Sequence, residues 1–232
     1  MQELIQQGKK QLKEKDLDGA EETFNRVLDQ EPTHFDGLYG RGLCRLKKRW
    51  LKEALEDFDT LVNLSPSDAS YVSERGVTYF LLGNLQLAME DFNRAVALEP
   101  DNSYRYSSRA FVKDKMNDTR GAIADYEKAI ELDPDDAIAY NNLGLVQEKA
   151  GYQQLAKKNF KKADAFNPPQ YSVDWKKPGE QKLEKAAVNP SNQHQNRPGL
   201  KDYRKVAASV FTSGEIFREF ISFVGTLMQR KK

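Results

Sequence analysis

The sequence repeats itself every 34 residues through nearly three quarters of its length. Each of five successive copies carries a small residue, an aromatic ring four positions later and a closing proline. A repeat of this length is one supersecondary unit that buries its apolar face only against neighbouring copies, so a stacked array is expected. The three sets are Ala20, Ala54, Ala88, Ala122 and Ala156; Phe24, Phe58, Phe92, Tyr126 and Phe160; and Pro32, Pro66, Pro100, Pro134 and Pro168.

The spacing inside each copy is helical. The alanine of each copy and the small or aliphatic residue seven positions later lie on one helical face, where short side chains let a neighbouring helix approach closely. Glycines, with Ala110 in the fourth copy, take the matching place in the preceding helix, and the prolines end the second helix. The pattern predicts helices near residues 2–14, 18–30, 36–48, 52–64, 70–82, 86–98, 104–116, 120–132, 138–150 and 154–166.

These positions resemble the tetratricopeptide repeat (TPR) family, whose 34-residue unit has the same small residue, aromatic ring and proline. The resemblance implies an all-α fold, a TPR-type right-handed α-solenoid of helix-turn-helix repeats, with a C-terminal helical segment added. The family's aromatic residue at position 11 is kept only as Tyr79. Gln11, Arg45, Lys113 and Gln147 replace it, which predicts looser packing there. The five repeats are 1–34, 35–68, 69–102, 103–136 and 137–168.

The first helix of every pair lines a concave groove in this family, and that groove is the default binding face. We therefore expect a non-enzymatic scaffold that binds a protein or peptide segment there. Packing between repeats is the alternative role for each apolar side chain. The predicted apolar contacts are Tyr39, Leu43, Val77, Phe80, Tyr104, Phe111 and Leu145, and the predicted contacts to a ligand's backbone are Ser108, Asn141 and Asn142.

Co-chaperones of this fold hold a C-terminal carboxylate with lysine, asparagine and arginine at five fixed positions. When the five positions are counted from the first repeat of this chain, the last two, where the clamp has lysine and arginine, are Ser70 and Glu74. The cationic side chains of the clamp are therefore absent, and so are its asparagines. Later registers match no better. Since a buried carboxylate needs cationic partners, chaperone tails are not expected as ligands.

Other function classes find little support in the sequence. The formal net charge is +1, and the basic stretch at residues 45–52 is typical of a solvated helix end, so nucleic-acid binding is not expected. His34, His194 and Cys44 form no recognisable catalytic pairing or metal-ligand spacing, so no enzyme activity, cofactor or metal is expected. The single cysteine and the absence of a signal-peptide pattern favour a cytoplasmic location.

The repeat pattern ceases after Pro168. Residues 169–200 read as a proline-rich polar linker, and residues 201–232 as an amphipathic helical tail with a capping box at Thr212 and Glu215. Residues 171–232 carry 12 basic and 6 acidic side chains, whereas residues 1–170 carry 24 and 29, which favours attraction between the two parts. The predicted docking side chains of the tail are Phe217, Phe220, Ile221, Val224 and Leu227.

The tail has several alternative roles. A helix over residues 213–229 would extend roughly 25 Å, which is short of the ~30 Å apolar thickness of a bilayer. The remaining hypotheses are an intramolecular cap or groove competitor, a homodimer contact of a self-assembling structural protein, a site for another protein, and a membrane-surface adaptor.

Overall fold

The computed structural model describes residues 1–166, and these residues form ten α-helices and no strand. The ten helices predicted within the repeats are confirmed, and each observed end lies within one residue of its predicted position. The predicted linker at 169–200, the tail at 201–232 and the tail's docking residues lie outside the described residues. The helices are α1 (Gln2–Lys13), α2 (Leu17–Gln30), α3 (Phe35–Lys47), α4 (Leu51–Leu64), α5 (Ala69–Leu81), α6 (Leu85–Leu98), α7 (Ser103–Lys115), α8 (Thr119–Leu132), α9 (Ala137–Lys149) and α10 (Gln153–Phe166).

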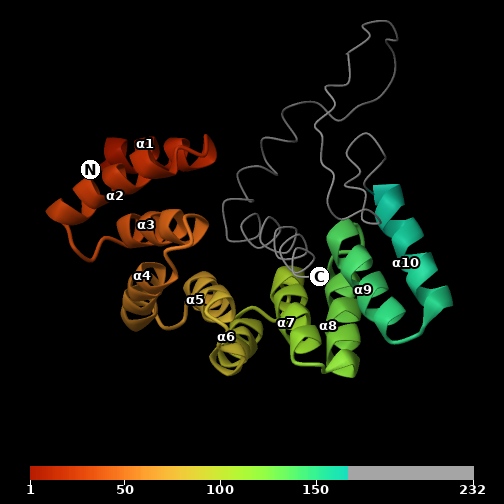
Figure 1. Ribbon diagram of the computed structural model, residues 1–232. Helices are drawn as coiled ribbons and strands as arrows, with labels where there is room; N and C mark the ends of the chain where they lie inside the picture. The colour runs from red at the N-terminus through yellow and green to blue at the C-terminus, as the bar shows by residue number, and fades with distance from the viewer. Residues whose placement is uncertain (167–232) are drawn as a thin grey trace, which may run out of the picture. The chain divides into compact units, whose positions relative to one another are not determined.

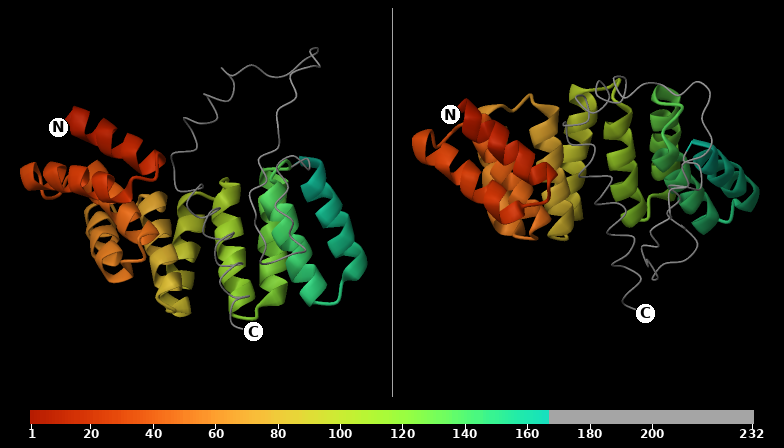
Figure 2. Two further views of the ribbon diagram at one scale, coloured as in Figure 1. Left: turned by 45° about the horizontal axis from the view of Figure 1, so that its top comes forward. Right: turned by 90° about the horizontal axis from the view of Figure 1, so that it is seen from above.

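The helices pair as first and second members of successive repeats, and the pairs stack in chain order from α1 to α10 (Figure 1). The same order is seen from the two other directions in Figure 2. Residues 1–163 form one compact unit, which contains all of these helices except the last three residues of α10. Among the described helices, none has both the length and the apolar character needed to cross a membrane.

The core consists of the aromatic and small residues of the repeat pattern. The rings of Phe24, Phe58, Phe92 and Tyr126 are at most 1% exposed, and the alanines four positions before them are fully buried. A Cβ atom added at Gly42 would lie 3.0 Å from the ring of Phe58, so the glycine is needed for the close approach of α3 and α4. Each buried ring stabilises the stack by roughly 1.5–3 kcal/mol, which explains why the aromatic ring recurs.

The turn inside each repeat requires a left-handed backbone. Gly83 and Gly151 have φ of +84°, as expected from their predicted place where the first helix ends. The other repeats place Lys15, Arg49 and Asn117 at the same position, with φ of 64°, 67° and 63°. The second helix then begins directly, capped by a side chain such as that of Asp118, which accepts a hydrogen bond from the amide of Gly121.

Candidate functional site

Three buried ion pairs join the first and second helices of the three central repeats. In each, an arginine of the first helix donates through Nε and Nη2 to an aspartate of the second helix, and its Nη1 donates to a side chain of the preceding repeat. Bidentate pairs of this kind fix geometry as well as adding energy. The pairs are Arg41 with Asp57 at 2.7 Å, Arg75 with Asp91 at 2.7 Å and Arg109 with Asp125 at 2.8 Å, and the preceding-repeat partners are Asn25, Asp59 and Asn93.

Looser packing was predicted where the aromatic ring at repeat position 11 is absent, and the polar side chain at each of these places forms a specific pair. Each polar residue there bonds to the residue twelve positions later in the second helix: Thr23 donates to Gln11 at 2.8 Å, and Asn159 donates to Gln147 at 2.8 Å. Arg45 pairs with Asp57 and Lys113 with Asp125, at 2.9 and 2.8 Å. The polar side chains replace the aromatic contact with hydrogen bonds, so these turns are held by specific pairs.

The basic stretch at residues 45–52 is also less solvated than predicted. Arg45 has a side chain 17% exposed and pairs with Glu21 as well as with Asp57. Lys48 pairs with Asp18 and Glu21 at 2.6 and 2.9 Å, and its ammonium lies 3.8 Å from the ring centroid of Trp50. Arg45 and Lys48 are therefore engaged by acidic side chains within the chain, whereas Arg49 and Lys52 of the same stretch are exposed.

Aromatic side chains follow the first helices from repeat to repeat. Phe80 of α5 and Phe111 of α7 have ring centroids 5.3 Å apart, and Tyr39 of α3 lies 5.6 Å from Tyr71 of α5. Phe35 stacks on Tyr71 at 6.1 Å and is 43% exposed. Sequence reasoning missed Phe35 and Tyr71 because the first and third positions of the repeat were not projected onto the groove, although their aromatic character was a usable signal.

The other predicted apolar contacts differ in exposure. Leu43, Val77 and Phe111 are buried, whereas Tyr39, Phe80 and Tyr104 are half-buried. Leu145 of α9 is 45% exposed. The most accessible of the predicted apolar side chains is therefore at the C-terminal end of the stack, and the aromatic contacts lie in its middle.

The three predicted backbone-binding residues are differently engaged. The hydroxyl of Ser108 donates to the carbonyl of Tyr104 in its own helix at 2.8 Å. The Asn142 side chain is hydrogen bonded to the buried hydroxyl of Tyr126, whose pKa is raised by burial. Asn141 donates to Asn142 at 3.4 Å, while its Oδ1 atom is buried and has no partner. Of the three, only Asn141 has a side-chain acceptor that the described helices leave without a donor.

Glu74 lies in the middle of α5. Buried carboxyl groups in proteins usually have hydrogen-bond partners, and Glu74 departs from this rule. It is 1% exposed, and within residues 1–166 neither of its carboxylate oxygens has a hydrogen-bond partner. Burial raises the pKa of Glu74 to about 8, although Arg105 and Lys47 act to lower it. Sequence reasoning noticed Glu74 only as a residue that spoils a carboxylate clamp.

Arg105 of α7 lies beside this carboxyl group and is itself almost completely buried. Its Nε atom donates to Glu99 at 2.8 Å, its Nη1 to Ser73 at 2.9 Å and its Nη2 to Ser70 at 3.2 Å. Although burial opposes it, the Arg105 guanidinium lowers the pKa of Glu99. Arg105 therefore ties α7 to α5 and to the turn before α7, and its influence on Glu74 is electrostatic.

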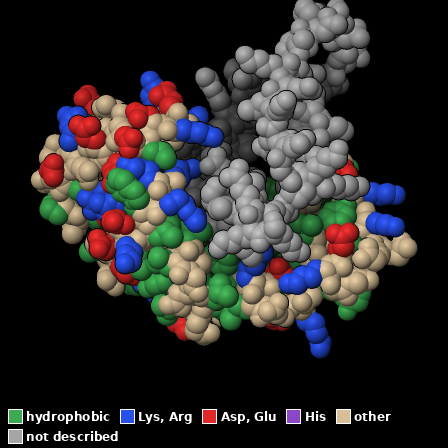
Figure 3. All heavy atoms as spheres, viewed as in Figure 1, with side chains coloured by type: hydrophobic (Ala, Val, Ile, Leu, Met, Phe, Trp, Pro, Cys, Tyr) green, Lys and Arg blue, Asp and Glu red, His purple; other side chains and the backbone are tan. Residues whose placement is uncertain are grey.

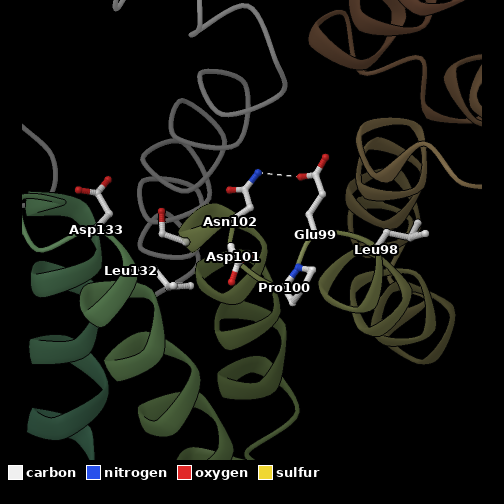
Figure 4. A pocket seen from close by; sticks show the side chains of 8 residues that line it. Leu98, Glu99, Pro100, Asp101, Asn102, Leu132 and Asp133 are labelled. Carbon is white, nitrogen blue, oxygen red and sulfur yellow. Dashed lines mark hydrogen bonds between the residues drawn. The ribbon is translucent and has the colours of Figure 1, made fainter.

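A depression of about 710 Å³ lies at the turns that follow α6 and α8, and the Glu99 that pairs with Arg105 is part of its lining. Its lining includes Glu99, Asp101 and Asp133, and Asn102 donates to Glu99 across it at 2.7 Å (Figure 4). No Lys, Arg or His lines this depression. Its polar side chains serve the start of α7, since Asn102 also accepts from the amide of Tyr104.

The surface is mixed in charge where it can be seen. Figure 3 shows Lys and Arg side chains interspersed with Asp and Glu over the N-terminal helices. Within residues 1–166, no group of three His, Cys, Asp or Glu side chains is placed to hold a metal ion. Cys44 is buried, and this burial raises the pKa of its thiol to about 12, so it is not a reactive nucleophile.

Comparison with known protein families matches four repeat models along the chain. The matches are described as tetratricopeptide repeat at residues 5–69, 73–102 and 137–170, and as TPR repeat at residues 115–151. Together they cover more than half of the chain. No curated protein sequence matches it.

Solved structures with a similar fold are tetratricopeptide repeat proteins. A crystal structure of MamA is 29% identical, with a TM-score of 0.60, over 69% of this chain and 94% of that one. TTC0263, a thermophilic TPR protein of Thermus thermophilus, is 22% identical, with a TM-score of 0.64, over 72% and 92% of the two chains. YrrB, described as a TPR protein with an unusual peptide-binding site, is 19% identical, with a TM-score of 0.56, over 72% and 86%.

Proposed function

Because the chain belongs to the tetratricopeptide repeat family, whose members are typically non-enzymatic scaffolds, we propose that it binds a peptide or helix of another protein. The proposed binding surface is the face formed by the first helices α3, α5, α7 and α9, which we call the groove face. The apolar contacts are those named from the sequence, from Tyr39 to Leu145, with Asn141 bonding to the ligand's backbone.

The row of aromatic contacts across repeats carries this proposal. Phe80 and Phe111 meet between α5 and α7, while Tyr39 and Tyr71 meet between α3 and α5. The recurring packing of a repeat needs the ring of the second helix, such as Phe92, but it does not need these additional rings on the first helices. Aromatic side chains that are half-buried on one face are typical anchors for a protein ligand. The peptide-binding site described for YrrB, which has a similar fold, supports the same assignment.

The proposal is tested by selecting phage-displayed random peptides on the full-length protein and measuring the affinity of the selected peptides. Replacing Phe80 and Phe111 together by alanine is expected to weaken binding by about tenfold or more. Leu145→Ala, at an exposed position, gives a second groove variant that leaves the core intact. Leu64→Ala, on the second helix α4 and 45% exposed, is the matched control. Binding that is unchanged in both groove variants would refute the proposal.

We further propose that the C-terminal tail acts as an intramolecular cap or as a competitor for the groove face. The tail's apolar residues, from Phe217 to Leu227, and its excess of basic side chains support this role, because residues 1–170 carry an excess of acidic ones. A chain that ends at Val188 should bind the selected peptides more tightly if the tail competes, and equally well if it caps the last repeat. Hydrogen exchange of the same pair of chains separates capping, with exposure confined to repeat five, from no docking at all.

A further inference from the structure

The molecule treats its buried carboxylates in two ways. Asp57, Asp91 and Asp125 each accept at least one hydrogen bond of 2.7 Å from an arginine of their own repeat. Glu74 is similarly buried, at 1% exposed, and both of its oxygens lack a hydrogen-bond partner among the residues that the structure describes. An ionised carboxylate that is buried without a partner is much less favourable than a paired one. The fold therefore leaves one acidic group without the hydrogen bonds that it gives to the others.

The position of Glu74 on α5 directs it away from the core. Gly76, two residues later, packs against Phe92 and Asp91 of α6. Two residues turn a helix by about 200°, so Glu74 lies on the opposite side of α5. Val77 and Ser70, at three and four residues from Glu74, share this side. The charged groups that act on Glu74 come from the first helices on either side of α5, Lys47 from α3 and Arg105 from α7. Glu74 is therefore on the groove face.

Neither Arg105 nor Lys47 donates a hydrogen bond to the Glu74 carboxyl group. Arg105 uses Nε, Nη1 and Nη2 for Glu99, Ser73 and Ser70. Lys47 acts on Glu74 through its charge, and no hydrogen bond joins them. Among residues 1–166 no donor satisfies Glu74, so its carboxyl group is available to a donor from a bound molecule.

We propose that Glu74 binds the cationic side chain of an arginine or lysine in the peptide ligand, which makes it the specificity-determining residue of the groove face. This inference rests on the proposed function and names the chemistry of the ligand. The matching segment carries one basic residue flanked by aliphatic or aromatic residues, because Val77, Phe80 and Phe111 belong to the same face.

Two further unpartnered atoms continue the site along the stack. Ser107 Oγ and Asn141 Oδ1 are buried and have no hydrogen-bond partner in residues 1–166, and they occupy the same repeat position in α7 and α9. These atoms are able to accept hydrogen bonds from the amides of a bound segment. All three side chains can act as acceptors, so the site suits a ligand that brings donors, and an acidic segment would place like charges together.

The raised pKa of Glu74 agrees with a site that is completed by a cation. An opposite charge within a few ångströms favours the ionised carboxyl group, so a bound guanidinium or ammonium would reverse the effect of burial. Affinity for a basic peptide then includes the formation of a charge-assisted hydrogen bond in a site that excludes water.

The test compares peptides selected from a phage-displayed random library on the full-length protein and on its Glu74→Gln variant. The wild-type protein is expected to enrich arginine or lysine beside apolar residues, and Glu74→Gln is expected to lose the enrichment of basic residues while retaining the apolar ones. Glu56→Gln, which changes an exposed carboxylate on α4, is the matched control. For one selected peptide, replacing its basic residue by glutamine should weaken binding by about tenfold or more to the wild type and little to Glu74→Gln.

The outcomes separate this inference from the proposed function. Peptides that depend on Phe80 and Phe111 but show no basic residue, or that keep it on Glu74→Gln, would overturn the role of Glu74 and leave the groove in place. Selected peptides that ignore Phe80, Phe111 and Leu145 would overturn the groove itself. The glutamine replacement in the peptide tests the pair without altering the protein, so a folding defect of the Glu74 variant does not obscure the result.

Discussion

Two sides of helix α5 handle a buried carboxylate in opposite ways. On the side facing α6, Asp91 is 5% exposed and accepts two hydrogen bonds from Arg75, at 2.7 and 2.9 Å. On the groove face, Glu74 is 1% exposed and accepts no hydrogen bond from the described part of the chain. The arginine–aspartate pair recurs in three repeats. Glu74 occupies the sixth position of its repeat, and this position is acidic only in the third repeat. The difference indicates that the fold itself requires the aspartates but has no use for Glu74, which is consistent with a role toward a ligand.

The terminal repeats extend the comparison to neutral partners. Where the arginine is absent, as at Gln7 and Leu143, the aspartate is absent too, and Thr23 and Asn159 stand in its place. These residues bond to Gln11 and Gln147 instead. The arginine and the aspartate of the pair are therefore present together or absent together. Because both are absent in the terminal repeats, no unpaired charge is buried there.

The largest expected effect on stability comes from removing one partner of a buried arginine–aspartate pair. Arg75→Ala leaves Asp91 buried without its cation and should lower the free energy of unfolding by about 3 kcal/mol. The pKa of Arg75 is raised, above all by its hydrogen bond to Asp91, which shows how strongly the pair favours the charged state. Chemical denaturation followed by circular dichroism measures the loss. The double variant Arg75→Ala with Asp91→Asn should recover part of it, and a single variant as stable as the wild type would contradict the account.

The open carboxylate should show itself in the pH dependence of stability. Its pKa is about 8 in the folded chain and 4.5 at its ordinary value, so the unfolded chain gives up this proton at lower pH. The protonated Glu74 therefore makes its whole contribution to the free energy of unfolding below pH 4.5. This contribution is lost as the pH rises towards 8, and the free energy of unfolding falls by up to ~1.4 kcal/mol per pH unit. Denaturation of the wild type and Glu74→Gln across this range isolates the effect. A difference that does not vary with pH would exclude the raised pKa.

The smallest effect is expected for a neutral pair at the end of the stack. Gln11→Ala removes the acceptor of the Thr23 hydroxyl, which is 3% exposed, and should cost about 1 kcal/mol. Thermal unfolding of this variant beside Arg75→Ala compares the neutral and charged versions of one contact. Equal losses would mean that the charge adds nothing to the packing of the central repeats.

The sequence predicted the helices closely because each repeat states the same pattern again. The period places every proline, small residue and ring five times, so an error in one copy is corrected by the others. The pairing of positions 11 and 23 was also open to prediction, since Gln11 with Thr23 and Lys113 with Asp125 change together. It was missed because position 11 was judged only by the loss of its aromatic ring.

The role of Glu74 could not be predicted from one sequence. It depends on which groups accept hydrogen bonds from the nearby cations. Arg105 lies in the next repeat and donates to Glu99, Ser70 and Ser73. In the sequence, Glu74 is one of many acidic residues, and its neighbours along the chain do not indicate that it is buried without a partner.

The most direct test of the central claim is to follow the side-chain carboxyl carbon of Glu74 by NMR during a pH titration, with the signal assigned from Glu74→Gln. The account predicts a midpoint near 8 in the free protein. A bound peptide with an arginine should move this midpoint downward by at least about one unit, and its glutamine counterpart should not. A midpoint near 4.5 in the free protein, or one that the basic peptide leaves unchanged, would contradict the claim that this carboxylate awaits a cation from the ligand.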